Sequence, residues 1–185
     1  MKILFITSFY SAVRQSIISD NWQPTGMPAI VKLFEGLKDE CIEFDNIFIS
    51  SPIKSKTKTI SYTNSMFNNQ IMFFQFSKKL NTKFFRNFGS FINSLLVFRK
   101  VKSTIKEQNY DVIYVDRANR VAGALLAYSG SKVILRLHGI TMLFTFYKSY
   151  KNVFLNFMQF FSFRAPYKYI ICTEDGTPGK QFLVK

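Results

Sequence analysis

The chain has 185 residues, of which 48% are hydrophobic and 19% are charged. This length fits one domain, residues 1–185, and the composition excludes an intrinsically disordered chain, which would lack the apolar side chains that fill a core. Lys and Arg outnumber Asp and Glu by 25 to 11, giving a formal net charge of +14. We therefore expect an anionic partner: nucleic acid, acidic phospholipid or a phosphorylated small molecule.

Cysteine and histidine are scarce in the chain. Cys41 and Cys172 are predicted to be buried free thiols in apolar surroundings, and with one histidine we expect no metal site and no bound cofactor. Residues 1–8 resemble a first strand rather than a signal peptide, and no apolar run reaches the roughly 20 residues that span a bilayer. The sequence thus predicts a cytoplasmic protein, soluble or peripheral on the inner face of the cell membrane.

The first half of the chain is predicted to begin as strand, loop and helix. Pro28 suits the first turn of that helix, because the amide hydrogen that proline lacks would be unpaired there in any case. In chain order the expected elements are a strand at 2–7, a loop at 8–26, a helix at 28–37, a strand at 42–49, a loop at 50–69 and a strand at 70–76.

The second half continues the alternation of helices and strands. In chain order it predicts a helix at 88–108, a strand at 112–115, a helix at 120–128, a strand at 132–137, an aromatic helix at 144–163, a strand at 169–172 and the start of another helix at 178–185. Short, continuously apolar strands between helices are typical of a parallel sheet covered on both faces. We therefore predict an α/β fold, Rossmann-like and doubly wound, with a mostly parallel sheet.

Four segments carry a resemblance to a known family. They are the loop containing Gly26, the tetrapeptide Tyr-Asp-Val-Ile at 110–113, the pentapeptide Leu-Arg-Leu-His-Gly at 135–139 and the pentapeptide Tyr-Ile-Ile-Cys-Thr at 169–173. In order and spacing they resemble the amino-terminal domain of GT-B glycosyltransferases of family four. The resemblance implies two Rossmann-like halves facing across a cleft, with the acceptor held by the first half and the sugar nucleotide by the second. This chain would be the first half of a longer, two-domain enzyme.

The sequence departs from that family in two places. Many members carry paired glycines after the first strand, whereas this chain has the single Gly26. The paired-glutamate segment that holds the donor sugar in the family has no counterpart in these 185 residues. The donor-binding, carboxy-terminal domain is therefore expected to be a missing partner.

His138 is the candidate catalytic residue. It is the sole histidine and follows a predicted strand, at the edge where open α/β sheets bind ligands. The resemblance implies that it hydrogen-bonds the donor sugar near the reacting carbon and is not a nucleophile. The alternative is a structural side chain that is satisfied by a neighbouring carbonyl at the end of the strand.

Substrate binding is assigned to polar residues and glycines in the loops. Gly26 precedes a helix amino terminus, whose amides could face a diphosphate, although a simple turn is the alternative. Arginines could neutralise a phosphate, and the acidic Glu174 with Asp175 could hold acceptor hydroxyls, unless these side chains are only solvated surface. The predicted substrate-binding residues are Gly26, Arg14, Asp116, Arg117, Gly139 and Glu174.

Basic and phenylalanine residues are interleaved between positions 73 and 102. Such a mixture favours an acidic membrane, while a core stripe with a solvated basic face is the alternative. Stacking of bases on the aromatic rings is a further alternative, but no RNA-binding or helix-turn-helix motif accompanies it, so we expect no nucleic-acid partner. The predicted membrane-facing residues are Lys78, Lys79, Lys83, Arg86, Phe84 and Phe85.

These observations lead to one hypothesis and one alternative. The hypothesis is a transferase that moves a hexose-type sugar from a nucleoside diphosphate sugar, its co-substrate, to a glycan or lipid-linked acceptor in cell-surface polysaccharide synthesis. The alternative is a non-catalytic α/β module that binds an acidic membrane or a partner protein.

Overall fold

A computed structural model describes residues 1–9, 11–25, 28–49, 58–64, 67–75, 86–138 and 157–173. The strands of this part of the chain are β1 (Lys2–Ser8), β2 (Glu43–Ile49), β3 (Lys58–Asn64), β4 (Phe67–Gln75), β5 (Val112–Asp116), β6 (Val133–His138) and β7 (Tyr169–Thr173). The helices are α1 (Ser11–Ile18), α2 (Pro28–Asp39), α3 (Arg86–Glu107), α4 (Arg120–Tyr128) and α7 (Phe157–Phe163), with a 3-10 turn η2 (Arg117–Asn119) after β5.

The described strands form one sheet in the order β3-β4-β2-β1-β5-β6-β7. Every neighbouring pair is parallel except β3 and β4, which are antiparallel at one edge. Without β3, the sheet has the strand order of the Rossmann fold, in which the chain winds outward from β1 first in one direction and then in the other. The predicted α/β, doubly wound, mostly parallel fold is therefore confirmed.

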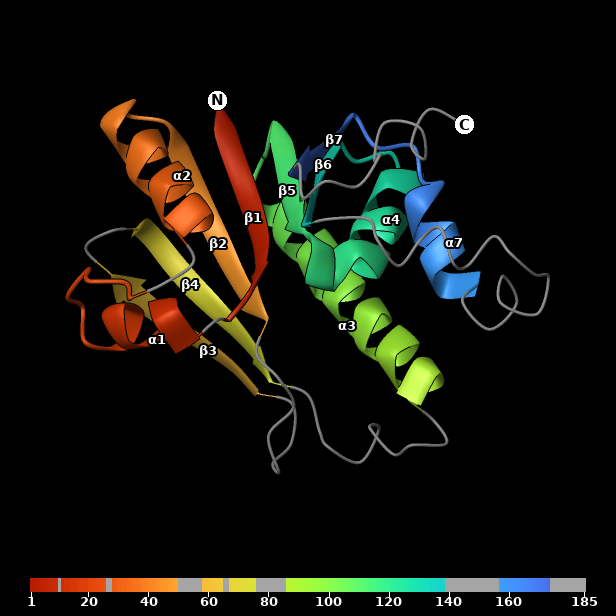
Figure 1. Cartoon of the computed structure of the whole chain (residues 1–185), viewed down its shortest axis with the longest axis horizontal. Helices are drawn as coiled ribbons and strands as arrows, with labels where there is room; N and C mark the ends of the chain where they lie inside the picture. Colours follow the sequence, from red (N-terminus) through yellow and green to blue (C-terminus); the bar gives the residue numbers. More distant parts are fainter. Residues whose placement is uncertain are drawn as a thin grey trace.

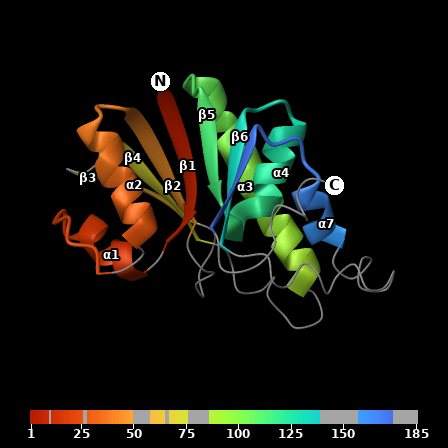
Figure 2. The same cartoon turned by 45° about the horizontal axis from the view of Figure 1, so that its top comes forward.

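Helices cover both faces of the sheet, as Figures 1 and 2 show. Successive side chains of a strand point to opposite faces, so Ile3 and Phe5 of β1 pack under α1 and α2. Leu4 and Ile6, between and beyond them, pack under α3, α4 and α7 on the other face. The near-continuous apolar sequence of β1 is thus explained by burial on both sides.

The core under α1 and α2 is largely aromatic. The Phe5 ring lies 5.2 Å from that of Phe34 in an edge-to-face arrangement, and the Phe34 ring stacks on Phe44 at 5.6 Å. Phe34 belongs to the buried stripe of α2, with Ile30 and Val31, and is only 1% exposed. The unusual phenylalanine content of the sequence is used here as core packing.

The core under α3 and α4 is largely aliphatic, and α4 approaches β5 closely. Val97 and Val101 of α3 and Leu126 of α4 are buried against β5 and β6. Gly123 brings the backbone of α4 so near β5 that a Cβ atom there would lie 3.0 Å from Cγ1 of Val115. A glycine inside this helix therefore serves close approach of helix and strand.

An ionic network fixes the amino ends of the central strands. The ammonium of Lys2 lies 2.9 Å from Oε1 of Glu43 and 3.6 Å from Oδ2 of Asp45, a carboxylate that is nearly buried. The hydroxyl of Tyr110 donates a hydrogen bond of 2.6 Å to the same Asp45 oxygen, and the Lys2 amide donates to Asp111 at 2.8 Å. These contacts join β1, β2 and the start of β5.

Several predicted elements need correction. The helix α1 lies within the stretch 8–26 that was expected to be a loop, and β3 lies within the expected loop at 50–69. Both segments are rich in polar residues, so neither shows a clear apolar periodicity in the sequence. The described buried residues of α1 are Val13, Ser16 and Ile17. The expected helix at 144–163 is confirmed where the structure describes it, since residues 157–163 form α7.

The prediction of two buried thiols was wrong for Cys41, which is exposed, whereas Cys172 is partly buried against the aliphatic core. Cys41 lies in the turn after α2 and has a positive φ of 52°. Its apolar neighbour Ile42 turns toward the core instead.

None of the helices in the described part of the chain has both the length and the hydropathy needed to cross a bilayer.

Candidate functional site

The strand order places the candidate site at the carboxyl ends of β1 and β5. From β1 the chain continues to β2 on one side of the strand order, and from β5 to β6 on the other. Doubly wound sheets bind ligands at the point where this direction reverses. After β5 the 3-10 turn η2 contacts both β1 and β6. The residues that follow β1, β5 and β6 therefore surround one edge of the sheet.

Buried polar side chains gather toward this edge on the face covered by α1 and α2. Thr7 donates a hydrogen bond of 3.0 Å to Oδ1 of Asn46, and both residues are almost fully buried. On the neighbouring strands Asp116 is the direct register partner of Arg136, and both are also buried. Burial of four polar residues on one face is expensive without mutual hydrogen bonds, so such groups usually serve a site or a specific network.

Tyr114 lies on the same face, and the charges of Arg136 and Asp116 affect the pKa of its hydroxyl. Burial raises the pKa of its hydroxyl above the ordinary value of 10.0, and the neighbouring Arg136 lowers it in part through its charge and a hydrogen bond. The Tyr114 ring packs on Phe5 at 4.8 Å. A buried guanidinium beside a carboxylate and a phenol forms a preorganised cluster that can hydrogen-bond hydroxyl groups at the sheet edge.

Two buried amide nitrogens have no hydrogen-bond partner within the described structure. They are the Nδ2 atoms of Asn46 and of Asn119, which ends η2 and is 9% exposed. An unsatisfied buried donor costs roughly 1–3 kcal/mol. Asn119 leads directly into α4, whose first residue Arg120 places its guanidinium over the Phe163 ring at 5.8 Å.

Arg14 lies on the outer side of α1, close to the end of β1. It is exposed, and its guanidinium lies 5.7 Å from the centroid of the Phe9 ring. Phe9 extends the ladder of β1, because its amide donates to the carbonyl of Ile49 at 2.8 Å, and its ring contacts Phe48 at 5.4 Å. A cation at this position is accessible from solvent and anchored by an aromatic ring.

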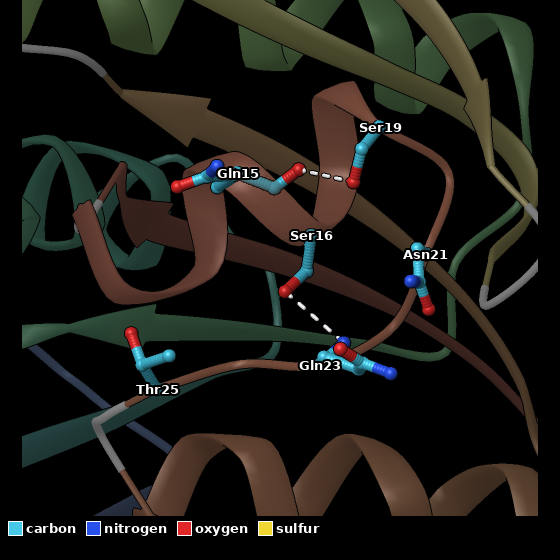
Figure 3. Close-up of a pocket in the computed structure, with 6 residues that line it drawn as sticks. All are labelled: Gln15, Ser16, Ser19, Asn21, Gln23 and Thr25. Atoms are coloured by element: carbon cyan, nitrogen blue, oxygen red, sulfur yellow. Dashed lines mark hydrogen bonds between the residues drawn. The ribbon is translucent and has the colours of Figure 1, made fainter.

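A polar pocket of about 300 Å³ opens between α1 and the segment that leads to α2 (Figure 3). The lining residues that the structure describes carry neutral hydroxyl and amide groups. Ser16 accepts a hydrogen bond of 3.2 Å from the Gln23 amide, and Ser19 donates to the Gln15 carbonyl at 2.8 Å, so two hydroxyls hold the backbone of the pocket wall. The lining residues are Gln15, Ser16, Ser19, Asn21, Gln23 and Thr25.

The structure places some of the predicted site residues near this edge. Asp116 ends β5 as a buried residue, Arg117 begins η2, and Arg14 is exposed on α1. His138 ends β6 and is in register with Thr173 of β7, so the expected position at a carboxyl end is confirmed. The remaining predicted residues, Gly26, Gly139 and Glu174, lie outside the described residues, as do Lys78, Lys79, Lys83, Phe84 and Phe85. Arg86 begins α3.

Sequence reasoning missed several polar residues of the site. Arg136 was part of the quoted segment at 135–139 but was not singled out, although a charged residue between two leucines of a central strand is itself a signal of a buried partner. Asn46 gave a weaker signal, as a polar residue that follows Asp45 within a strand that is otherwise largely apolar. The pocket residues gave none, because glutamines, serines and asparagines are common on any exposed helix or loop.

Comparisons with known proteins do not assign the chain to a family. No family model matches the chain, and no curated protein matches it.

Proposed function

We propose that the chain is the acceptor-side half of a sugar-nucleotide-dependent glycosyltransferase. In this proposal the chain holds a glycan or lipid-linked acceptor, to which a hexose-type sugar is transferred during cell-surface polysaccharide synthesis. A donor-binding domain completes the enzyme. Two observations support the proposal: the Rossmann-like fold, and the four segments of the sequence that resemble the glycosyltransferase family. A non-catalytic binding module is the alternative.

The observation that carries the proposal is the neutral character of the described lining of the pocket between α1 and the segment that leads to α2. Its amide groups, on Gln15, Asn21 and Gln23, can each donate and accept hydrogen bonds, and its hydroxyls can do the same. A lining without charges does not neutralise a diphosphate, but it matches the hydroxyl groups of a sugar ring. A volume of about 300 Å³ lies at the small end of ligand pockets. An acceptor glycan fits this chemistry better than a sugar nucleotide does.

The remaining polar groups have distinct roles in this proposal. The buried cluster of Tyr114, Asp116 and Arg136 orients hydroxyl groups at the sheet edge, and Arg14 attracts a phosphate of a lipid-linked acceptor from solvent. His138, at the end of β6, hydrogen-bonds the donor sugar. Closure against the second domain excludes water from the transfer.

Glycan binding to the 185-residue chain tests the acceptor role directly. We expect neutral oligosaccharides to shift the NMR signals of the Asn21 and Gln23 side-chain amides, and Asn21→Ala with Gln23→Ala to weaken binding by about tenfold to thirtyfold, at about 1 kcal/mol per lost hydrogen bond. Asn109→Ala, an exposed amide at the opposite edge of the sheet, is the control and should leave binding unchanged. Equal losses in both variants would reject the pocket as the glycan site.

The catalytic role needs the complete two-domain enzyme. His138→Ala should reduce sugar transfer by about a hundredfold, the size of effect that loss of one well-placed polar group has on a transition state. Glycan binding by the same variant should be retained. Unchanged turnover would remove His138 from the mechanism, and the absence of any transfer activity in the complete wild-type protein would favour the binding module.

A further inference from the structure

A basic stripe lies on the outer side of α3. Arg99, Lys102 and Lys106 are all exposed and recur at helical spacing, while Val97 and Val101 face the aliphatic core. The ammonium of Lys102 is held over the Phe98 ring at 5.4 Å. The one acidic residue on this helix is Glu107, at its last position.

Apolar side chains lie on α4 and α7, which belong to the same helical layer as α3 (Figure 1). Val121, Leu125 and Tyr128 recur at spacings of four and three residues on the side of α4 that faces away from the sheet, and Tyr128 is 49% exposed. Its ring stacks on Phe161 at 4.9 Å, and Phe161 lies 6.5 Å from Phe157, which is 58% exposed. Large aromatic side chains are seldom left so exposed without a partner.

The opposite helical layer has a different surface. On α2 the basic and acidic residues are mixed, and Lys32 pairs with Glu35 at 3.3 Å. Neither α4 nor α7 contains an acidic residue. The excess positive charge is therefore not spread evenly over the described helices but concentrated on the layer that also exposes aromatic rings.

We propose that this layer docks the protein on an acidic phospholipid bilayer. The docking face consists of Arg99, Lys102, Lys106, Val121, Leu125, Tyr128 and Phe157. Its basic residues attract the anionic headgroups, and its aromatic and aliphatic residues enter the boundary between headgroups and acyl chains. Nucleic acid fits less well, because aliphatic side chains such as Val121 and Leu125 provide no stacking surface for bases.

This docking face differs from the segment 78–86 of the sequence prediction and lies on described helices. The proposal is independent of the transferase proposal, because a vesicle without glycan or sugar nucleotide suffices to test it. Docking through this layer also leaves the layer of α1 and α2, with its polar pocket, facing away from the bilayer and open to solvent.

The first test is sedimentation of the 185-residue chain with vesicles of phosphatidylcholine alone or with phosphatidylglycerol added. We expect binding only to the acidic vesicles, weakening as salt is raised. Each basic residue near an acidic leaflet contributes about fivefold in partitioning, so Arg99→Gln, Lys102→Gln and Lys106→Gln together should lower it by about a hundredfold. The matched control, Lys32→Gln with Lys38→Gln on the opposite layer, should change it much less. Equal losses in both sets, or equal binding to neutral vesicles, would overturn the proposal.

A second variant reports on the apolar part of the face without removing charge. Phe157→Trp places a new indole at an exposed position, whereas the native Trp22 donates to Glu35 in the opposite layer at 3.2 Å. We expect the added emission to shift to the blue on acidic vesicles and to be quenched by brominated acyl chains. An unshifted, unquenched indole, or binding to a single-stranded oligonucleotide without binding to acidic vesicles, would overturn membrane docking.

Discussion

The cores on the two faces of the sheet differ in their side chains. Under α1 and α2 the core is aromatic, and four polar residues are buried on that face, Thr7, Asn46, Asp116 and Arg136. Asp116 ends β5 and Thr7 is next to last in β1, whereas Asn46 lies in the middle of β2. Under α3, α4 and α7 the core is aliphatic, and its ionic network, centred on Asp45, lies at the amino ends.

We infer from this difference that the amino ends of the strands serve stability, whereas the carboxyl ends serve the proposed function. The network at the amino ends joins three strands, with Lys2 and Tyr110 both directed at Oδ2 of Asp45. The polar groups at the carboxyl ends lie where a doubly wound sheet binds ligands. The aliphatic face then needs only to hold α3 and α4 tightly, which leaves their outer surface free for another partner.

Truncation of the aromatic core should have the largest effect. Phe34→Ala is expected to lower the free energy of unfolding by roughly 3–5 kcal/mol, because it removes a buried ring that contacts both Phe5 and Phe44. The change should also alter the native fluorescence of Trp22, which packs in the same core. Leu126→Ala, in the aliphatic core, should destabilise by roughly 2–5 kcal/mol but leave that fluorescence unchanged. Equal fluorescence changes would show that the two cores are not separate.

Close packing on the aliphatic face can be broken at a single glycine. Gly123→Val should destabilise by roughly 1–3 kcal/mol in denaturant titrations, because even its Cβ would press on Val115 at 3.0 Å. Gly36, on the exposed side of α2, is the control: no atom lies within 4 Å of a Cβ built there. Gly36→Ala should stabilise by about 0.5–1 kcal/mol through helix propensity. A stable Gly123→Val variant would mean that α4 is not held tightly on β5.

The ionic network at the amino ends should have the smallest effect at neutral pH. Tyr110→Phe removes a hydrogen bond to Asp45 and should cost about 1 kcal/mol. Burial and the Asp45 carboxylate raise the pKa of Tyr110 above its ordinary value of 10.0, and the carboxylate of Glu43 raises that of Lys2 above 10.5.

The sign of the pH dependence follows from these directions. The folded state holds both protons more tightly than the unfolded state, so their contribution to stability is complete below pH 10 and is lost as the pH rises above it. Chemical denaturation between pH 8 and 11 should show this fall, and Tyr110→Phe should make it shallower. An equally steep fall in the variant would assign it to other groups, such as the buried Tyr114 and the partly buried Tyr167, whose pKa values are also raised.

Part of the fold was readable in the sequence because local patterns decided it. The apolar runs at β1, β5 and β6 are buried on both faces, and Pro28 begins α2 as its missing amide hydrogen requires. The helix α1 and the edge strand β3 were not predicted, since neither sequence has a wide apolar stripe; the described buried residues of α1 are Val13, Ser16 and Ile17.

The candidate site was readable only in outline. Loops after strands could be predicted to hold Asp116, Arg117 and His138, because the carboxyl ends of parallel strands share one edge. The neighbours of those residues could not be predicted. Register alone pairs Asp116 with Arg136, and the path of the chain after α1 alone brings Gln15 opposite Gln23.

The sequence by itself determined the class of this protein, an α/β chain whose apolar strands need cover on both faces, and its strong positive charge. Only the tertiary structure decided which face each residue joins. A strand exposes alternate side chains to opposite layers, so buried polar residues came together under α1 and α2, while Arg99 and Phe157, far apart in the sequence, came to lie in the same helical layer. Those placements depend on strand order and helix packing, which no local pattern specifies.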